Sequence, residues 1–525
     1  MTTPPRLLRQ RVAEIHHLIA AGQLERAGHA CEHLASTFPD QPLAWQVFSE
    51  LWLSCRHFDH ALNCARKACS LAPGDTAAQG QLAKALAFTG QVEQAIGVAD
   101  QVLGSDPKDP AALATVGGVF GMAGIHDRAL TCFRAASELA PEHPGHLYNL
   151  ATSLRLHGQD RKAEAAYDRL LALNPDDAEA WYSRSQLRRQ TEDSNHVEVL
   201  RERIADGGDQ RLLIHLNYAL GKELDDLGRY PEAFDAIGKG ARLQDSLLGY
   251  HPDDDIEAMD ALARTFSEPA GRAGDKGSVG PIFVVGLPRT ATTLVEQILG
   301  RHSRVSALGE LPDFQLELLQ RADIRPGSAQ AMQAVVAGAD RTDYASVGRR
   351  YLQRVRQRHG NPEIFVDKLP GNLAVLGPIE RALPGARIIV LERDLMDTAL
   401  AIYTTLFRFG YPYSYDLDKL ARYLIAAHDL RQHWLDTLPE SMIMPLRYED
   451  LVSEPESQAR RLLDHCGLNW EENCLAPTDS SQAVATPSAG QVRQPIYRSS
   501  VARWKNYATQ LEGLRRQLVT AGVID

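Results

Sequence analysis

Long apolar runs are absent from this chain of 525 residues. No stretch approaches the roughly 18 uninterrupted apolar residues that a helix needs to cross a bilayer. The N-terminal segment also lacks the apolar core and the cleavage site of a secretory signal. We therefore expect neither a membrane span nor secretion, and the cytoplasm is the expected location.

Cysteine is scarce, and basic charge falls short of acidic charge. Seven cysteines, an odd number, form no C-x-x-C pairs and show no metal-ligand spacing to histidine: Cys31, Cys55, Cys64, Cys69, Cys132, Cys466 and Cys474. We expect free thiols and no metal site. The formal charge of -11, from 56 basic and 67 acidic residues, argues against a dedicated nucleic-acid binder. A local basic pocket could still hold a phosphorylated ligand.

The composition is that of a globular protein with several domains. Hydrophobic residues make up 44% of the chain and charged residues 23%, and neither glycine nor proline is in the excess that marks disordered or fibrous chains. At about 150 residues per domain, the length predicts two to four folded units.

A repeat runs through the first half of the chain. Proline recurs every 34 residues, at positions 39, 73, 107, 141 and 175. Alanine keeps the same period twelve residues ahead of each proline. Small residues share another position of the repeat: Ser49, Ala83, Gly117 and Ala151. This pattern predicts two helices per repeat, because small residues let paired helices approach and proline ends the second helix.

The pattern resembles the tetratricopeptide repeat over residues 8–177. A further unit begins near Trp181, loses the pattern and regains it at Leu220, Gly221 and Leu224, so we expect the array to end near residue 250. The resemblance implies an all-helical solenoid over residues 1–250 whose groove binds a peptide or protein. A rigid spacer or a dimerisation arm without a ligand is the alternative.

A change of period follows the repeats. Residues 267–280 are rich in glycine, serine and charge, and we place a linker at 251–280. Four short apolar runs then alternate with helical patterns, at 281–285, 363–367, 387–391 and 441–446. Such runs are typical of buried parallel strands. The sequence thus predicts a three-layer α/β domain at 281–525 that binds ligands beyond the carboxyl ends of its strands.

The first run leads into residues 286–293, a loop with one arginine, Arg289, and three threonines ahead of a helical pattern. Hydroxyls and N–H groups at a helix N-terminus predict an anion site. A nucleoside-triphosphate loop would need G-x-x-x-x-G-K-[ST], whereas Ala291 replaces its second glycine and Thr292 its lysine. ATP hydrolysis is therefore disfavoured, and Arg289 offers a charged fork to a phosphate or sulfate oxygen.

This loop resembles the 5′-phosphosulfate loop of sulfotransferases, which use 3′-phosphoadenosine 5′-phosphosulfate as donor. It is most similar to the loops of tyrosylprotein sulfotransferases and of bacterial proteins that join tetratricopeptide repeats to a sulfotransferase domain. The similarity spans residues 281 to about 508. It implies that the loop holds the donor through Pro288, Arg289, Thr290, Ala291, Thr292 and Thr293.

A second landmark of that family is an arginine after a strand, followed eight residues later by a serine, which together hold the 3′-phosphate of the donor. Arg393 fits the arginine, but Ala401 stands where the serine is expected. The missing hydrogen bond must come from a neighbour such as Thr404 or Thr405, or is absent. An ion pair of Arg393 with a nearby aspartate is the alternative.

The third landmark is a basic segment near the C-terminus. Residues 488–505 carry four basic side chains and no acidic one and resemble the family's loop that closes over the donor. The resemblance implies donor contacts from Arg493, Arg498 and Arg503, and from Tyr448, which matches a tyrosine near the donor in related enzymes. An ordinary solvated basic stretch is the alternative.

Sulfuryl transfer needs a base for the acceptor hydroxyl and cations for the leaving group. Glu310 matches the general base of the tyrosylprotein enzymes, while Lys368 and Ser488 match residues that stabilise the transition state there. Arg289 completes the implied catalytic set. No metal or redox cofactor is expected.

Two of these assignments have competitors. His302 is a second candidate base, since cytosolic sulfotransferases use histidine, although this family commonly has a structural histidine at that place. Lys368 could instead pair with its neighbour Asp367. From the residues alone, Glu310 could equally be a surface or helix-capping carboxylate.

The sequence favours a sulfotransferase whose repeats recruit an acceptor, with a peptide or protein tyrosine as one candidate acceptor. A repeat scaffold with a degenerate, inactive transferase domain is the alternative, and Ala401 supports it. A nucleotide-dependent kinase is disfavoured by the missing loop lysine. The sequence does not choose the acceptor or the ligand of the groove.

Overall fold

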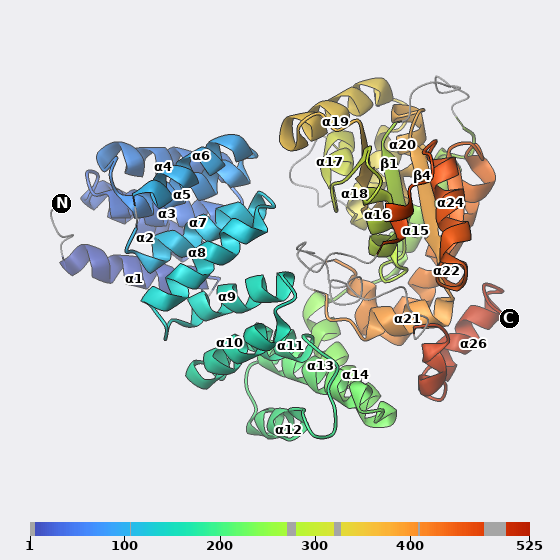
Figure 1. Ribbon diagram of the computed structural model, residues 1–525, viewed down its shortest axis with the longest axis horizontal. Helices are drawn as coiled ribbons and strands as arrows, with labels where there is room; N and C mark the ends of the chain where they lie inside the picture. Colours follow the sequence, from blue (N-terminus) through green and yellow to red (C-terminus); the bar gives the residue numbers. More distant parts are fainter. Residues whose placement is uncertain are drawn as a thin grey trace. The chain divides into compact units, whose positions relative to one another are not determined.

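The computed structural model describes residues 6–20, 22–105, 107–269, 280–319, 327–407, 410–476 and 500–525 (Figure 1). The chain forms two compact units, Met1–Ala180 and Trp181–Asp525. Within the described ranges, no helix combines the length and the apolar character needed to cross a bilayer.

The first unit is built from helix pairs, drawn in blue to cyan in Figure 1. Its helices are α1 (Arg6–Ala20), α2 (Leu24–Thr37), α3 (Pro42–Ser54), α4 (Phe58–Leu71), α5 (Thr76–Phe88), α6 (Val92–Gly104), α7 (Pro110–Met122), α8 (His126–Leu139), α9 (Pro144–Leu156) and α10 (Asp160–Leu173). The second helix of every pair ends two or three residues before a repeat proline, as expected because proline disfavours helical backbone at the preceding residue. The predicted all-helical solenoid is confirmed for this unit.

The small residues of the repeat lie where paired helices approach most closely. Ser49, Ala83 and Ala151 are fully buried, and the Ser49 hydroxyl donates to the Ala61 carbonyl of α4 at 2.9 Å. A β-carbon at Gly117 would lie 2.7 Å from the Phe133 ring of α8. These positions are small because a larger side chain would separate the two helices of a repeat.

The second compact unit begins at Trp181, within the helical region, whereas the sequence places the division near residue 250. α11 (Ala178–Ser185) spans the boundary, and α12 (Val197–Asp206), α13 (Gln210–Asp226) and α14 (Tyr230–Leu248) follow it. α13 and α14 form the returning repeat unit. Their apolar faces share one core with α21 (Leu395–Tyr403) and α22 (Leu417–Thr437). In this core Tyr218 and Ile237 lie with Leu400 and Tyr403. Burial of this surface attaches the pair to the α/β domain.

The predicted linker at 251–280 is also corrected in part. Its first half forms α15 (Asp253–Thr265). Met259 and Leu262 of this helix are buried in the core of the α/β domain, together with Trp434. Apolar residues recur at helical spacing in α15 and form one apolar face of the helix. This face packs into the core of the α/β domain. Residues 270–279 lie outside the described ranges.

A five-stranded parallel sheet forms the centre of the second unit. Its strands are β1 (Ile282–Gly286), β2 (Val305–Ala307), β3 (Ile364–Asp367), β4 (Arg387–Glu392) and β5 (Ile443–Arg447), in the spatial order β2-β3-β1-β4-β5. The register places Phe283 beside Ile388 of β4 and Asp367 of β3. The predicted parallel sheet is confirmed, with β2 as a strand too short for the sequence to reveal.

Helices cover both faces of this sheet, which makes three layers. Alternate residues of β1 face opposite sides: Phe283 and Val285 enter one core, while Ile282 and Val284 enter the other. The covering elements are α16 (Thr292–Gly300), α17 (Asp313–Leu319), α18 (Ala329–Gly338), α19 (Tyr344–His359), η1 (Pro370–Val375), α20 (Leu376–Ala382), α21 (Leu395–Tyr403), η2 (Pro412–Tyr415), α22 (Leu417–Thr437), α23 (Tyr448–Ser453), α24 (Pro455–His465), η3 (Glu472–Leu475), η4 (Arg503–Tyr507) and α26 (Glu512–Thr520).

Candidate active site

The carboxyl edge of the sheet carries a row of the predicted site residues. Glu310 follows β2, Lys368 follows β3, Arg289 follows β1, Arg393 follows β4 and Tyr448 follows β5. Neighbouring strands lie about 4.8 Å apart, and all five strands run in the same direction. The parallel sheet therefore brings residues that are far apart in sequence to one edge.

The loop after β1 has a strained backbone. Arg289 and Ala291 have φ values of 67° and 75°, in the left-handed region that costs residues other than glycine roughly 1–2 kcal/mol each. The Thr290 hydroxyl donates to the Leu287 carbonyl at 2.7 Å, which closes the loop on itself. Ala291 thus adopts the backbone conformation that the glycine of a nucleoside-triphosphate loop supplies without strain.

The loop ends at the first turn of α16, where Thr292 and Thr293 are buried. Backbone N–H groups at the start of a helix have no partner within that helix and attract anions. This turn is therefore a suitable place for a phosphate or sulfate group.

Arg393 joins this loop to the segment near the C-terminus. Its Nη1 donates to the Arg289 carbonyl at 2.9 Å, and its Nη2 donates to the Ser500 carbonyl at 2.8 Å. Its guanidinium carbon lies 5.1 Å from the centre of the Tyr448 ring. The structure therefore brings together three of the predicted donor-binding regions.

The aspartates near Arg393 have other partners within the described structure. Asp394 caps α21 by accepting a hydrogen bond from the Asp397 N–H. Asp397 accepts hydrogen bonds from the N–H groups of Ala502 and Trp504, at 2.6 and 2.9 Å. Burial raises the pKa of Asp397, and these hydrogen bonds oppose the increase. Asp397 thus anchors the segment whose carbonyl orients Arg393.

Arg503 makes a different contact from the predicted one. Its guanidinium pairs with Asp225 at the end of α13, and the Tyr507 hydroxyl donates to the same carboxylate. The Arg503 charge therefore holds η4 against α13 in this structure, and its role as a donor ligand stays a prediction. Ser488, Arg493 and Arg498 lie outside the described residues.

Glu310 and Lys368 meet at the other side of the loop. Lys368 Nζ donates to Glu310 Oε1 at 2.7 Å. The Lys368 side chain is almost fully buried, whereas half of the Glu310 side chain is exposed. A second carboxylate, Glu296 of α16, has Oε2 at 3.9 Å from the same ammonium. A buried cation thus lies between an accessible and a buried carboxylate.

Asp367 does not pair with Lys368. Its carboxylate accepts hydrogen bonds from the Tyr351 hydroxyl at 2.8 Å and from Asn372 Nδ2 at 3.4 Å. Burial raises the pKa of Asp367 well above its usual range. Lys368 is therefore held by the carboxylates of Glu310 and Glu296, and the competing pairing with Asp367 is excluded in this structure.

The competing base His302 has a structural environment. Its Nε2 lies 3.0 Å from the Asn469 carbonyl, and its Nδ1 accepts from the Arg304 N–H at 3.2 Å. Only 3% of the residue is exposed. With both ring nitrogens bound to backbone groups, the imidazole ties α16 to the segment before η3 and is not placed to remove a proton from a substrate.

The threonines considered as substitutes for the missing serine are already engaged as donors. The Thr404 hydroxyl donates to the Leu400 carbonyl at 2.8 Å, and the Thr405 hydroxyl donates to the Ala401 carbonyl at 2.7 Å. A hydroxyl has one hydrogen to donate, so neither can donate to a phosphate in this conformation.

Tyr411 and Phe407 flank the site and were not singled out in the sequence. Their ring centres lie 4.8 Å apart, and Tyr411 has a left-handed φ of 52°. Burial raises the pKa of Tyr411, and the negative charge of Glu310 adds to the increase. An aromatic surface near Glu310 could not be inferred from sequence, because a long-range fold contact creates it.

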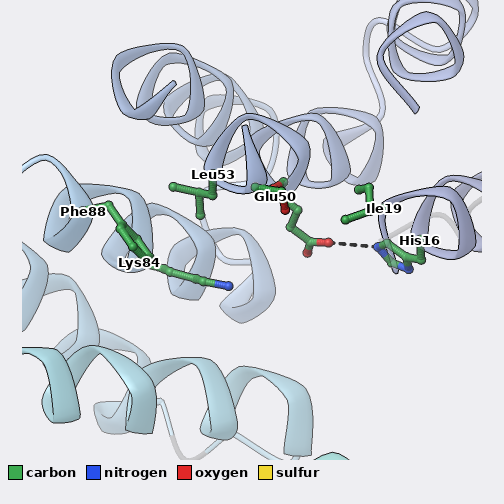
Figure 2. A pocket seen from close by; sticks show the side chains of 7 residues that line it. His16, Ile19, Glu50, Leu53, Lys84 and Phe88 are labelled. Carbon is green, nitrogen blue, oxygen red and sulfur yellow. Dashed lines mark hydrogen bonds and ion pairs between the residues drawn. The ribbon is translucent and has the colours of Figure 1, made fainter. Parts of the chain in front are cut away.

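A pocket on the first unit follows the repeat. His16, Glu50 and Lys84 occupy the same position in three successive repeats, on α1, α3 and α5. Figure 2 shows Glu50 and Lys84 extending from their helices into this pocket, with His16 bound to Glu50 at 2.9 Å. Apolar side chains complete the lining: Ile19, Leu53 and Phe88.

Comparison with known protein families agrees with both halves of this architecture. Residues 281–472 match the sulfotransferase family, and residues 56–117 and 147–177 match the tetratricopeptide repeat. This chain joins tetratricopeptide repeats to a C-terminal sulfotransferase domain. The domain includes the row of residues from Glu310 to Tyr448, whereas η4 and Arg503 lie beyond the matched region.

Curated relatives include an uncharacterized protein of Aquifex aeolicus, 30% identical over 392 residues, which covers 73% of this chain and 51% of the relative. Protein-tyrosine sulfotransferase 2 of Gallus gallus is 22% identical over 232 residues, 42% of this chain and 62% of the relative. The chain thus spans about half to two thirds of the length of these relatives.

Two solved structures show weaker likeness. The sulfotransferase domain of a Synechococcus olefin synthase is 20% identical, covers 45% of this chain and 90% of that chain, and has a TM-score of 0.32. A thermophilic tetratricopeptide-repeat protein of Thermus thermophilus is 19% identical and has a TM-score of 0.31. The match covers 34% of this chain and 98% of that chain. We draw no conclusion from scores this low.

Proposed function

We propose that this sulfotransferase domain moves a sulfuryl group from 3′-phosphoadenosine 5′-phosphosulfate to an acceptor hydroxyl. The observation that carries the proposal is the Glu310–Lys368 pair, joined at 2.7 Å at the same sheet edge as the phosphate loop. The reaction needs a base at the acceptor hydroxyl and positive charge at the leaving phosphate oxygen, and this pair supplies one group of each kind.

The residues around the loop suit such a donor. The first turn of α16, with buried Thr292 and Thr293, offers N–H groups and hydroxyls to the phosphosulfate. Arg289 and Arg393 supply positive charge within the same contact network. The donor supplies a sulfuryl group bonded to a phosphate oxygen, and that sulfur–oxygen bond breaks as the acceptor oxygen bonds to sulfur.

Glu310 would accept the proton of the acceptor hydroxyl. Its exposed half can meet an acceptor, whereas Glu296 is buried and already accepts a backbone hydrogen bond. Lys368 orients Glu310 through their hydrogen bond at 2.7 Å. As Glu310 gains the proton, the attraction between the pair weakens, and the ammonium becomes free to neutralise charge on the leaving phosphate oxygen.

A peptide or protein hydroxyl is the proposed acceptor, with the repeats as its recruiting element. Four curated relatives are protein-tyrosine sulfotransferases. The pocket on α1, α3 and α5 combines apolar side chains with Lys84, as a groove for an extended chain requires. A cytoplasmic location stays a prediction from the sequence.

Calorimetry with adenosine 3′,5′-bisphosphate and with ATP separates the proposal from its competitors. Tight binding of the bisphosphate supports the transferase, and a preference for ATP supports a kinase. Binding of neither supports a scaffold with a degenerate domain, which the engaged hydroxyls of Thr404 and Thr405 make the second candidate.

Transfer itself is measured with sulfur-labelled donor and a cell extract. We expect label to enter one fraction and Glu310→Gln to reduce the rate by roughly 10²–10⁴, the usual contribution of a general base, with bisphosphate affinity unchanged. Glu317→Gln is the matched control, since Glu317 is a buried glutamate paired with Arg350 elsewhere in the domain. Equal rates for Glu310→Gln and the parent protein would exclude Glu310 as the base.

A further inference from the structure

Glu296 is a buried carboxylate to which the proposed reaction assigns no role. It lies on α16, one helical turn after Thr292, and only 7% of the residue is exposed. Burial raises its pKa, and the positive charge of Lys368 opposes the increase. A carboxylate is costly to bury unless its partners compensate for the lost water, so its contacts indicate why it is placed there.

Those contacts hold the two elements that carry the base and the cation. Glu296 Oε1 accepts a hydrogen bond from the Gly309 N–H at 2.8 Å. Glu296 Oε2 lies 3.9 Å from Lys368 Nζ, and the Lys368 N–H donates to the Gly309 carbonyl at 2.9 Å. One side chain thus contacts both the residue before Glu310 and the ammonium that binds Glu310.

The charges explain why two carboxylates surround one lysine. The Lys368 side chain is 1% exposed, so its ammonium depends on neighbouring negative charge. Glu310 supplies that charge only until it takes up a proton. The negative charge of Glu310 is one of the causes that raise the pKa of Glu296, so protonation of Glu310 favours the charged form of Glu296 beside the same ammonium.

We propose that Glu296 is a positioning residue that keeps Lys368 charged and places Glu310 and Lys368 together beside the phosphate loop. This positioning role rests on the proposed function, because Glu310 and Lys368 need to be held together only if the domain transfers a sulfuryl group. The electrostatic part can be tested without any transfer, because it concerns the protonation of one lysine.

The test is acetylation of Lys368 by acetic anhydride in the full-length protein, followed by mass spectrometry at several pH values. Only the neutral amine reacts, and because the Lys368 side chain is 1% exposed, it reacts during local opening. The position of the pH profile reports charge, and the rate common to all pH values reports opening. In Glu296→Gln we expect Lys368 to react about tenfold faster at a given pH. The pH profile of acetylation should move to lower pH, because the loss of a neighbouring negative charge favours the neutral amine.

Two controls separate charge from loosened packing. Glu317→Gln makes the same substitution at an equally buried glutamate of the same domain, and it should leave the Lys368 profile unchanged. Lys419, which pairs with Asp245 at 2.7 Å, reports general loosening within each variant. Loosened packing would raise the rate at every pH without moving the profile.

The outcomes distinguish this inference from the proposed function. An unmoved Lys368 profile in Glu296→Gln would overturn the inference even if transfer is observed. A shifted profile in a protein that transfers no label would support the electrostatic role and count against the transferase. If Glu296→Gln fails to fold, the neutral variant Glu296→Met serves as the second variant, and a profile identical to that of the parent protein again overturns the inference.

Discussion

The strained loop shows how single residues prepare an anion site. Ala291 has the left-handed backbone that glycine adopts freely, yet its methyl group makes that conformation costly. The two threonines that follow it are fixed at the helix start. The residue types of the loop thus determine where N–H groups point, and the surrounding core maintains the strain.

Ala291→Gly tests that strain directly. We expect the free energy of unfolding to rise by about 1 kcal/mol, because glycine removes the left-handed penalty. Urea denaturation gives the value. Ala331→Gly, at a buried position within α18, should instead cost about 1 kcal/mol. A loss of stability in both variants would mean that Ala291 is not strained.

A second residue-scale prediction concerns His16 in the repeat pocket. Its hydrogen bond to Glu50 raises its pKa above the ordinary 6.5, although burial opposes the increase. The pair therefore contributes stability that is complete below pH 6.5 and is lost as the pH rises through the raised value.

The measurement is an NMR titration of His16, assigned with His16→Gln. The parent protein should titrate above 6.5, and Glu50→Gln should lower the midpoint. His29, exposed on α2 with Glu32 at 3.8 Å, provides a reference histidine whose midpoint should not change between the two proteins. A His16 midpoint unaffected by Glu50→Gln would contradict the assigned cause.

At the scale of elements, η4 links α13 to the loop that follows β1. Asp225 of α13 holds Arg503 and Tyr507, while Ser500 just before η4 accepts from Arg393. Arg393 in turn contacts the carbonyl of Arg289. The position of one helix is thereby connected to the phosphate loop through paired side chains.

Asp225→Asn should loosen this connection. We expect unfolding stability to fall by about 1–3 kcal/mol, the cost of weakening the hydrogen bond of the buried Tyr507 hydroxyl, and bisphosphate affinity to fall with it. Asp226→Asn is the control, because Asp226 holds Lys222 and the Gln190 N–H without touching η4. Calorimetry should show weaker binding only in Asp225→Asn, and equal weakening in both variants would count against the linkage.

At the scale of the whole molecule, the last helix pair of the repeat pattern belongs to the second compact unit, together with the sulfotransferase domain. Tyr218 and Ile237 share a core with Leu400 and Tyr403. The Tyr218 hydroxyl also donates to the Tyr403 carbonyl at 3.4 Å. The sulfotransferase domain therefore needs α13 and α14 for its core.

A fragment of residues 176–525 should accordingly fold without the first five helix pairs. We expect a single cooperative thermal transition and the bisphosphate affinity of the full chain. A fragment of residues 251–525, which lacks α13 and α14, should aggregate or melt without cooperativity, because an apolar face is left uncovered. Cooperative folding of the shorter fragment would show that the helix pair is dispensable.

The sequence by itself determined the helix pairs, the parallel sheet and the edge of that sheet at which the candidate residues lie. The 34-residue spacing predicts the packing role of Gly117 and the helix ends near the prolines, because the same contacts between neighbouring helices recur in every repeat. Arg289, Lys368 and Arg393 could be predicted because parallel strands deliver their carboxyl ends to one edge.

Only the tertiary structure decided the partners of these residues. Arg503 pairs with Asp225, which lies 278 positions earlier in the chain, and Lys368 pairs with Glu310 and Glu296 in preference to the adjacent Asp367. Charge pairing depends on distances of a few ångströms and on burial. For residues on separate elements, the sequence does not determine the distance between two charges or how deeply they are buried. The packing of the sheet against its helices determines both quantities.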